Sequence, residues 1–210
     1  MAGLGQAKIL GGIGSILTFL WLGLHLLQLL PVPYAGAVFA IVSWILVVIA
    51  VKKVADAIGD SKIFSNMLIA MLLLIIGIGV GAVWLSAALL DFSAGISREN
   101  TTLPFPASLF TSPASNIVGL VIAWVFPLLA SIYIRRCYGT ISLKTSVGIF
   151  NTTALLFLIG AATTIILVGF FVVLFAEILQ AIAFFSLPDE LPSRNNLPGE
   201  HGPYTTGTAG

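Results

Sequence analysis

The chain has 210 residues, of which 59% are hydrophobic and 8% are charged, and its formal net charge is +1. Soluble globular domains carry about a quarter charged residues, so this composition indicates a polytopic membrane protein. The balanced charge, with no basic cluster larger than a pair, excludes a nucleic acid as a partner. The single cysteine, Cys137, excludes an internal disulfide and a cysteine-based zinc site within one chain. We interpret it as a small apolar residue rather than a lipid anchor or an intermolecular disulfide.

Hydropathy and turn signals predict the first four membrane spans. They lie near residues 9–30, 35–51, 64–90 and 116–134. Lys8, the apolar run that follows it and the small residues at 35–37 together imitate a cleavable signal peptide. The run from Ile9 to Leu30 is longer than the usual h-region of about 7–15 residues, so we expect a retained helix.

A long apolar run from Ser146 to Leu187 follows, with Glu177 as its one charged residue and no proline. As one helix it would extend roughly 60 Å, about twice the hydrocarbon core of a bilayer. We expect a tight hairpin of two helices, near 148–165 and 168–187, that turns between Thr163 and Gly169. The predicted fold is therefore an all-α transmembrane helix bundle with six spans, or with five if the run is one oblique helix.

The distribution of basic residues predicts the orientation. If the second and fourth loops lie on the side of the N-terminus, seven of the nine Lys and Arg residues share that side, which the positive-inside rule assigns to the cytoplasm. We therefore expect a multi-pass protein of the cell membrane. The loop at 91–115 is then external. It contains the glycan acceptor pattern Asn100-Thr101-Thr102. Residues 188–210 have the composition of a disordered tail rich in Pro and Gly.

Several motifs resemble a known family. They are Lys8-Ile9-Leu10-Gly11-Gly12-Ile13-Gly14, the Val51-Lys52-Lys53 segment with Gly59-Asp60 and Ile63-Phe64, and the stretch from Leu158-Ile159-Gly160-Ala161 through Gly169-Phe170 to Ala183-Phe184-Phe185-Ser186-Leu187-Pro188. Over roughly residues 7–188 the chain resembles the uncharacterised, mostly archaeal membrane family known as domain of unknown function 996. That resemblance implies no activity, no cofactor and no catalytic or metal-binding residue.

Glu177 is the best candidate for a functional residue, because an ionisable group inside the bilayer is costly unless it is protonated, paired or hydrated. Gln180 follows on the same helix face, and His25 and Gln28 repeat that spacing in the first span. A contact between His25 and Glu177 would suit a proton or cation site. The alternative is that these polar groups bond to one another and simply hold helices together.

Other residues are candidates for roles in packing and bending. Pro127 interrupts the fourth span and is either a static kink or a hinge. Small residues allow helices to approach closely, either within one chain or between two copies. The glycines we expect at such contacts are Gly77, Gly81, Gly11, Gly12, Gly14, Gly160 and Gly169.

The sequence leaves two functions open, of which it favours the first. The first is a non-catalytic membrane scaffold or complex subunit that binds itself or another membrane protein through its glycine faces. The second is a small carrier or channel for a proton, a cation or a solute that uses Glu177. We do not expect an enzyme, because the spans supply one carboxylate and one imidazole rather than a nucleophile with its base. Membrane lipids are the other expected partners.

Overall fold

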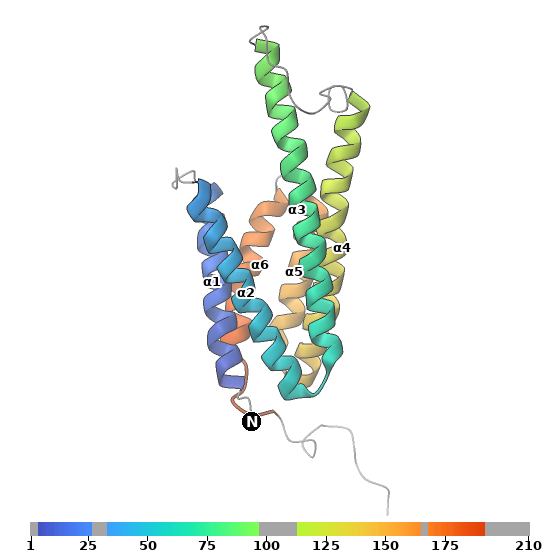
Figure 1. Ribbon diagram of the computed structural model, residues 1–210. Coiled ribbons are helices and arrows are strands. Elements are labelled where there is room, and N and C mark those ends of the chain that lie inside the picture. Colours follow the sequence, from blue (N-terminus) through green and yellow to red (C-terminus); the bar gives the residue numbers. More distant parts are fainter. Residues whose placement is uncertain (1–3, 27–32, 97–112, 165–167, 192–210) are drawn as a thin grey trace, which may run out of the picture.

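The computed structural model describes residues 4–26, 33–96, 113–164 and 168–191. At residues 25–26, 33–37, 85, 87–96 and 113–116 it describes the backbone alone. Within these residues the protein contains six α-helices and no strand, which confirms the predicted all-α class (Figure 1). The helices are α1 (Leu4–Leu26), α2 (Pro33–Ile58), α3 (Ser61–Ile96), α4 (Pro113–Thr145), α5 (Ile149–Thr163) and α6 (Val168–Phe185).

The long apolar run forms two helices rather than one. It divides into α5 and α6, and the break between them begins at Thr164, inside the region where the sequence predicts the turn. The two helices run antiparallel and lie close together where Gly160 faces Gly169 and Val173. The hydroxyl groups of Thr163 and Thr164 donate to carbonyl oxygens one turn earlier, at Ile159 and Gly160. These bonds satisfy two hydroxyl groups at the end of α5 without water.

Two helices continue past the basic pairs at which the sequence predicts that they end. The expected spans end at Val51 and Ile134, before the two basic pairs, but α2 continues to Ile58 and α4 to Thr145. Backbone chemistry, rather than charge, ends α2. Gly59 adopts the left-handed conformation with φ of +74°, and its N–H donates to the carbonyl of Ala55 at 2.9 Å. Glycine accepts this conformation without the steric cost of a Cβ atom.

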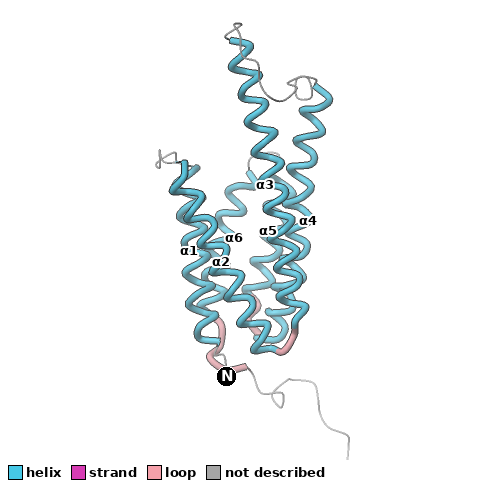
Figure 2. The backbone as a smooth tube through the Cα atoms, in the orientation of Figure 1, coloured by secondary structure: helices cyan, strands magenta, loops and turns pink. Residues whose placement is uncertain are grey.

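The six helices form a closed ring in which each helix packs against the next and α6 returns to α1. Figure 1 shows α3 and α4 as the longest pair, extending beyond the ends of the other four helices, and Figure 2 shows the short turns that join α2 to α3 and α4 to α5 at the opposite end. The first described residues of α1 and the segment after α6 lie together at that same end, where the Nζ atom of Lys8 is 3.6 Å from Asp189 Oδ1. The described ends of the chain therefore share one side of the bundle.

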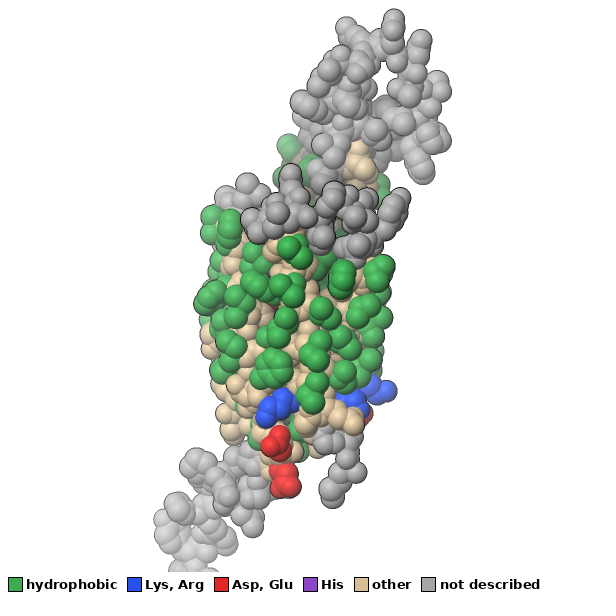
Figure 3. Space-filling model, turned by 90° about the vertical axis from the view of Figure 1, so that its left-hand side faces the viewer, with side chains coloured by type: hydrophobic (Ala, Val, Ile, Leu, Met, Phe, Trp, Pro, Cys, Tyr) green, Lys and Arg blue, Asp and Glu red, His purple; other side chains and the backbone are tan. Residues whose placement is uncertain are grey.

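The outer surface of the ring is apolar. Figure 3 shows hydrophobic side chains over the flank of the bundle, with Lys, Arg, Asp and Glu gathered at its lower rim. Among the described residues, five helices are long and apolar enough to cross a membrane: α1, α2, α3, α4 and α6. The remaining helix, α5, is equally apolar but has 15 residues, about 22 Å at 1.5 Å per residue. The protein is therefore a polytopic helical membrane protein.

Candidate functional site

Glu177 lies in the middle of α6 and is 8% exposed. Among the described residues, no hydrogen-bond donor reaches its enclosed Oε2 atom. A buried carboxylate oxygen without a donor is expensive in any apolar surrounding, because the water it gave up has not been replaced. The structure therefore places an unsatisfied acceptor inside the ring of helices.

Gln180, one turn along α6, belongs to a hydrogen-bonded network that joins three helices. The hydroxyl of Tyr138 in α4 donates to Gln180 Oε1 at 2.9 Å, and Gln180 Nε2 donates to the Ser15 hydroxyl in α1 at 2.8 Å. Ser15 in turn donates to the backbone carbonyl of Gly11 at 2.8 Å. All three side chains are buried. The network fixes how α1, α4 and α6 lie relative to one another.

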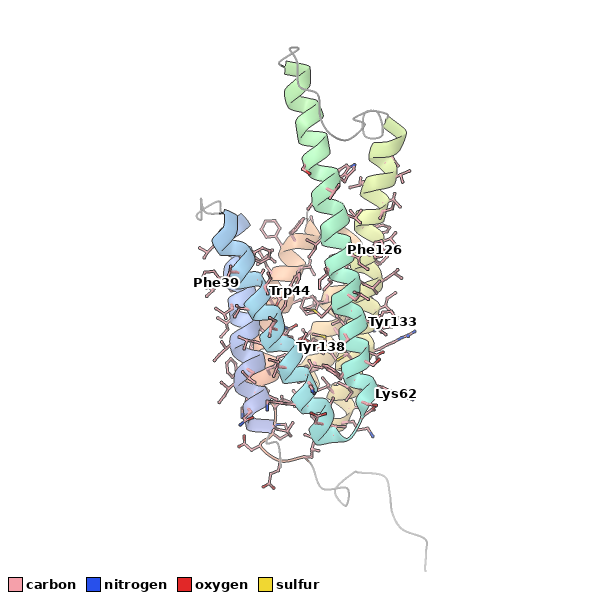
Figure 4. All side chains as sticks on the ribbon, viewed as in Figure 1. Phe39, Trp44, Lys62, Phe126, Tyr133 and Tyr138 are labelled. Atoms are coloured by element: carbon pink, nitrogen blue, oxygen red, sulfur yellow. The ribbon has the colours of Figure 1, made fainter. Side chains whose placement is uncertain are left out.

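An aromatic cluster borders this network on the side of the chain ends. Tyr138, Phe150 and Phe184 pack edge to face, with ring centroids 5.2 to 6.3 Å apart. They come from α4, α5 and α6, and the Phe184 ring lies directly against Gly11 of α1. Figure 4 shows Tyr138 among the helices in the lower half of the bundle. The rings close the interior between the polar network and the rim.

Two of the four predicted polar residues can be placed as a pair, and two cannot. Glu177 and Gln180 lie together on the inward face of α6. The backbone of His25 belongs to the last turns of α1, but its side chain and the whole of Gln28 lie outside the described residues. Because Ser15 is level with Gln180 and the helices run antiparallel, the His25 backbone lies roughly 10 Å beyond Glu177 along the helix axis at 1.5 Å per residue.

The sequence did not reveal Tyr138 and Ser15 as members of the site. Tyr138 follows Arg135 and Arg136, which we expected to end the fourth span, so it fell in a predicted loop. In the structure α4 continues and buries it completely. Ser15 follows Gly14, one of the glycines predicted at helix contacts, and the sequence assigns it no role of its own. A tyrosine and a serine on the inward faces of otherwise apolar helices were the available signal.

Although Glu177 is central in α6, it lies at about the same height along the bundle as Arg135 of α4. The helices α4 and α6 run in the same direction, because each is antiparallel to α5. Arg135 and Glu177 are each three residues before the pair that bonds, Tyr138 and Gln180. The Cα atoms of Arg135 and Glu177 therefore lie at similar heights, about one helical turn from that bond. The carboxylate is inside the ring, whereas Arg135 is exposed on the outside.

The candidate hinge Pro127 lies within α4, which continues as helix on both sides. Its ring is seated on α3: the Cδ atom is 3.0 Å from the position that a Cβ on Gly77 would occupy. One turn away, the Trp124 indole donates to the carbonyl of Ala161 at 3.0 Å. This carbonyl is among the last of α5 and has no partner within its own helix. The tryptophan therefore satisfies the end of the short helix.

All seven glycines expected at helix contacts face a neighbouring helix of the same chain. A Cβ atom at any of them would meet atoms of that helix within 4 Å, and at six of them it would meet an atom at 3.0 Å or less. The contacts are Gly11 with Phe184, Gly12 with Phe185, Gly14 with Val47 and Ser43, Gly77 with Phe126 and Pro127, Gly81 with Ala123, Gly160 with Val173, and Gly169 with Gly160. These faces are thus occupied within one protomer.

The remaining sequence-based interpretations concern Cys137, metal ligands, Asn100 and the tail, and the structure describes only part of these residues. Cys137 is fully buried, as an apolar residue would be, and is not accessible to a second chain or a lipid-transferring enzyme. The described residues contain no group of three or more His, Cys, Asp or Glu residues that could hold a metal ion. Asn100 lies outside the described residues, as does most of the tail after Leu191.

The chemistry that the site could support depends on its one carboxylate. Glu177 supplies a carboxylate, and Gln180, Tyr138 and Ser15 supply dipoles that are already bonded to one another. Nucleophilic catalysis would need a base beside a nucleophile, and acid–base hydrolysis would need a second carboxylate. Protonation, or capture of a small cation, needs only the free oxygen of Glu177.

Comparison with known proteins gives the family. Residues 39–178 match the family described as protein of unknown function DUF996. The chain is also 30% identical over 198 residues to the uncharacterized protein MJ1644 of Methanocaldococcus jannaschii, a match that covers 90% of this chain and 96% of that protein. No solved structure matches. The family match and the near-complete coverage of this relative agree with the motifs at 7–188, and the chain belongs to the DUF996 family of membrane proteins.

Proposed function

We propose that this protein is a small carrier or channel for protons or small cations, and that Glu177 is the group that binds the transported ion. The observation that carries the proposal is the buried Oε2 atom of Glu177, which has no donor among the described residues. A purely structural carboxylate would be expected to accept hydrogen bonds from its neighbours, as Gln180 does on the same face. An ionisable group inside the membrane that lacks such bonds is a functional candidate by default.

The surroundings of Glu177 favour a proton or a small cation over a larger solute. Three helices around the site are tied together by the Tyr138, Gln180 and Ser15 network, which leaves few polar groups free to coordinate a ligand. α6 packs against α5, which has no titratable residue, and against α1, whose titratable residues are Lys8 and His25. The helix α4, which bonds to α6 through Tyr138, carries five more: Tyr133, Arg135, Arg136, Cys137 and Lys144. Glu177 is therefore the one carboxylate available to the site among the described residues.

A scaffold function is the second candidate, and the structure changes which surface supports it. Its expected contacts were the glycine faces, and these now support packing within the protomer. Its remaining support is the broad apolar surface of α3 and α4, whose exposed side chains a neighbouring helix could cover as well as lipid. A partner that stays bound in a constant ratio through mild detergent extraction would favour this function.

The proposal includes an orientation in the cell membrane. The basic residues lie toward the end of the bundle that carries the described chain ends: Lys8, the two basic pairs, Lys62 and Lys144. Seven basic residues there face four acidic ones: Asp56, Asp60, Asp189 and Glu190. By the positive-inside rule this end is cytoplasmic and the far ends of α3 and α4 are external.

A flux assay in liposomes tests the transport function. Purified protein is reconstituted into liposomes that hold a pH-sensitive dye in their lumen. A pH or cation gradient is imposed across the membrane, and the change in luminal pH is followed. Glu177→Gln keeps the shape of the side chain and removes its charge, and we expect flux to fall to that of protein-free liposomes. Glu190→Gln, the same change at an exposed carboxylate, is the matched control. Equal flux in wild type and Glu177→Gln would refute the carrier and leave the scaffold.

A further inference from the structure

A separate feature lies on the outer face of α4, away from the candidate transport site. Its outward residues follow a helical spacing: Leu129 and Ile132 toward the membrane centre, then Arg135 and Arg136, then Gly139, and finally Leu143. Leu143 is 82% exposed, and Leu129 and Ile132 are also exposed. Two guanidinium groups therefore interrupt an apolar stripe that faces outward from the bundle.

The two arginines have no carboxylate partner in the described part of the chain. The one ion pair there joins Lys8 to Asp189. Two other basic groups at the same rim are also engaged, because Lys53 donates to Gln6 at 2.7 Å and Lys52 lies 5.8 Å from the centre of the Phe64 ring. Arg136 stacks over Tyr133 with its guanidinium carbon 5.4 Å from the ring centre, which leaves its N–H groups unused.

A gap in the side-chain surface lies next to the arginines. Gly139 follows Arg135 and Arg136 by one turn on the same face, and a Cβ atom placed on it would meet nothing within 4 Å. Between the guanidinium groups and Leu143 the helix therefore carries no side chain and has open space beside it, and we call this position the notch. The Thr140 hydroxyl bonds back to the carbonyl of Arg136 and does not fill the notch. Figure 4 shows Tyr133 and Lys62 on the same flank of the α3 and α4 pair.

We propose that Arg135 and Arg136, with the notch at Gly139, bind the phosphate headgroup of an anionic membrane lipid. Guanidinium groups match phosphate oxygens with paired hydrogen bonds, and the apolar residues toward the membrane centre suit the hydrocarbon chains of the same lipid. The position at the rim of the apolar surface is where headgroups lie if the basic end faces the cytoplasm. Lipid, rather than soluble phosphate, is favoured because apolar side chains flank the arginines on both sides.

Native mass spectrometry of the full chain tests this assignment. The protein is released by mild detergent from nanodiscs that contain equal parts of phosphatidylglycerol and phosphatidylcholine, and the retained lipids are counted. Wild type is expected to retain phosphatidylglycerol selectively. Arg135→Gln with Arg136→Gln should weaken that retention roughly 25-fold, the equivalent of about 1 kcal/mol per basic residue.

Two further variants separate a defined site from general attraction. Lys8→Gln with Lys53→Gln removes the same charge at the same rim from lysines that already have partners, and it should change retention less than about threefold. Gly139→Leu keeps every charge and fills the notch, so it should reduce retention although the helix stays intact. Phosphatidylglycerol retention is compared only among variants whose melting temperature equals that of wild type.

Three results would overturn the proposal. Equal losses in the two double variants would mean a diffuse electrostatic attraction rather than a site. Equal retention of the two lipids by wild type would mean that the arginines do not select anionic headgroups. Complete displacement of phosphatidylglycerol by millimolar glycerol phosphate would assign the site to a soluble phosphate compound. None of these results depends on flux through Glu177, so this proposal and the transport proposal stand or fall separately.

Discussion

The ammonium group of Lys8 lies 3.6 Å from a carboxylate oxygen of Asp189, which joins the start of α1 to the segment that follows α6. The pair is exposed, so its energetic contribution is small, but its geometry is informative. It places the two described ends of the chain at one end of the helix bundle. The five-span alternative, with one continuous last helix, predicts that these ends lie at opposite ends of the bundle.

The shared side of the two ends can be checked by cysteine labelling of intact cells. Glu190→Cys and Lys144→Cys lie at the same end of the bundle and should react with a maleimide only after the membrane is permeabilised. Asn100→Cys, in the loop expected to be external, should react without permeabilisation. The native Cys137 is buried and should stay silent in the folded protein, so it serves as an internal control rather than as a marker. Labelling of Glu190→Cys from outside would contradict the arrangement.

Removing the hydroxyl of Tyr138 should destabilise the protein. In Tyr138→Phe, the Oε1 atom of Gln180 loses its donor while it stays buried, and we expect a loss of about 1–3 kcal/mol in unfolding free energy. Thermal unfolding in detergent measures the effect. Tyr133→Phe removes the same atom from a half-buried ring and should be nearly neutral. Equal melting temperatures for the two variants would show that the network contributes nothing to stability.

The close contact of α1 with α6 should make Gly11 intolerant of any side chain. A Cβ atom there would overlap the Phe184 ring, which is itself held between Tyr138 and Phe150. Gly11→Ala should therefore cost about 1–3 kcal/mol, as overpacking of a core does. Gly23→Ala in the same helix meets nothing within 4 Å and should be neutral or slightly stabilising. Melting temperatures that ranked the variants in the opposite order would be inconsistent with this packing.

Two turn residues should respond in opposite directions. Gly59 has φ of +74°, so Gly59→Ala forces a Cβ atom into the left-handed region and should destabilise the protein by about 1 kcal/mol. Ser146, between α4 and α5, has φ of 59° and already bears that cost, so Ser146→Gly should raise the melting temperature. A fall in melting temperature for Ser146→Gly would show that its hydroxyl outweighs the backbone strain.

The sequence is sufficient to predict the helices because lipid requires every backbone group to bond within its own segment, so apolar length alone reveals them. It does not predict where α2 and α4 end. Lys52 and Arg135 look like terminators in a hydropathy profile, whereas helices of a packed bundle can carry charges past the apolar layer until a residue such as Gly59 ends them.

The candidate site was predictable only in part. Glu177 and Gln180 stand out because they are polar residues three apart on an apolar helix. Their partners do not stand out, because whether Ser15 meets Gln180 depends on the pairing of α1 with α6, which neither segment encodes by itself. The same pairing determines that the glycines at 11, 12 and 14 are used inside the protomer.

The contact between Pro127 and Gly77 limits how the longest helices can move. Proline removes one of the hydrogen bonds that stiffen α4, so bending is easiest at a level where α4 packs closely against α3. Gly77 has no side chain, so Pro127 packs directly against the α3 backbone. A change in the bend angle of α4 at Pro127 should therefore displace that backbone. The outer halves of α3 and α4 should therefore swing as one rigid arm against the remaining four helices.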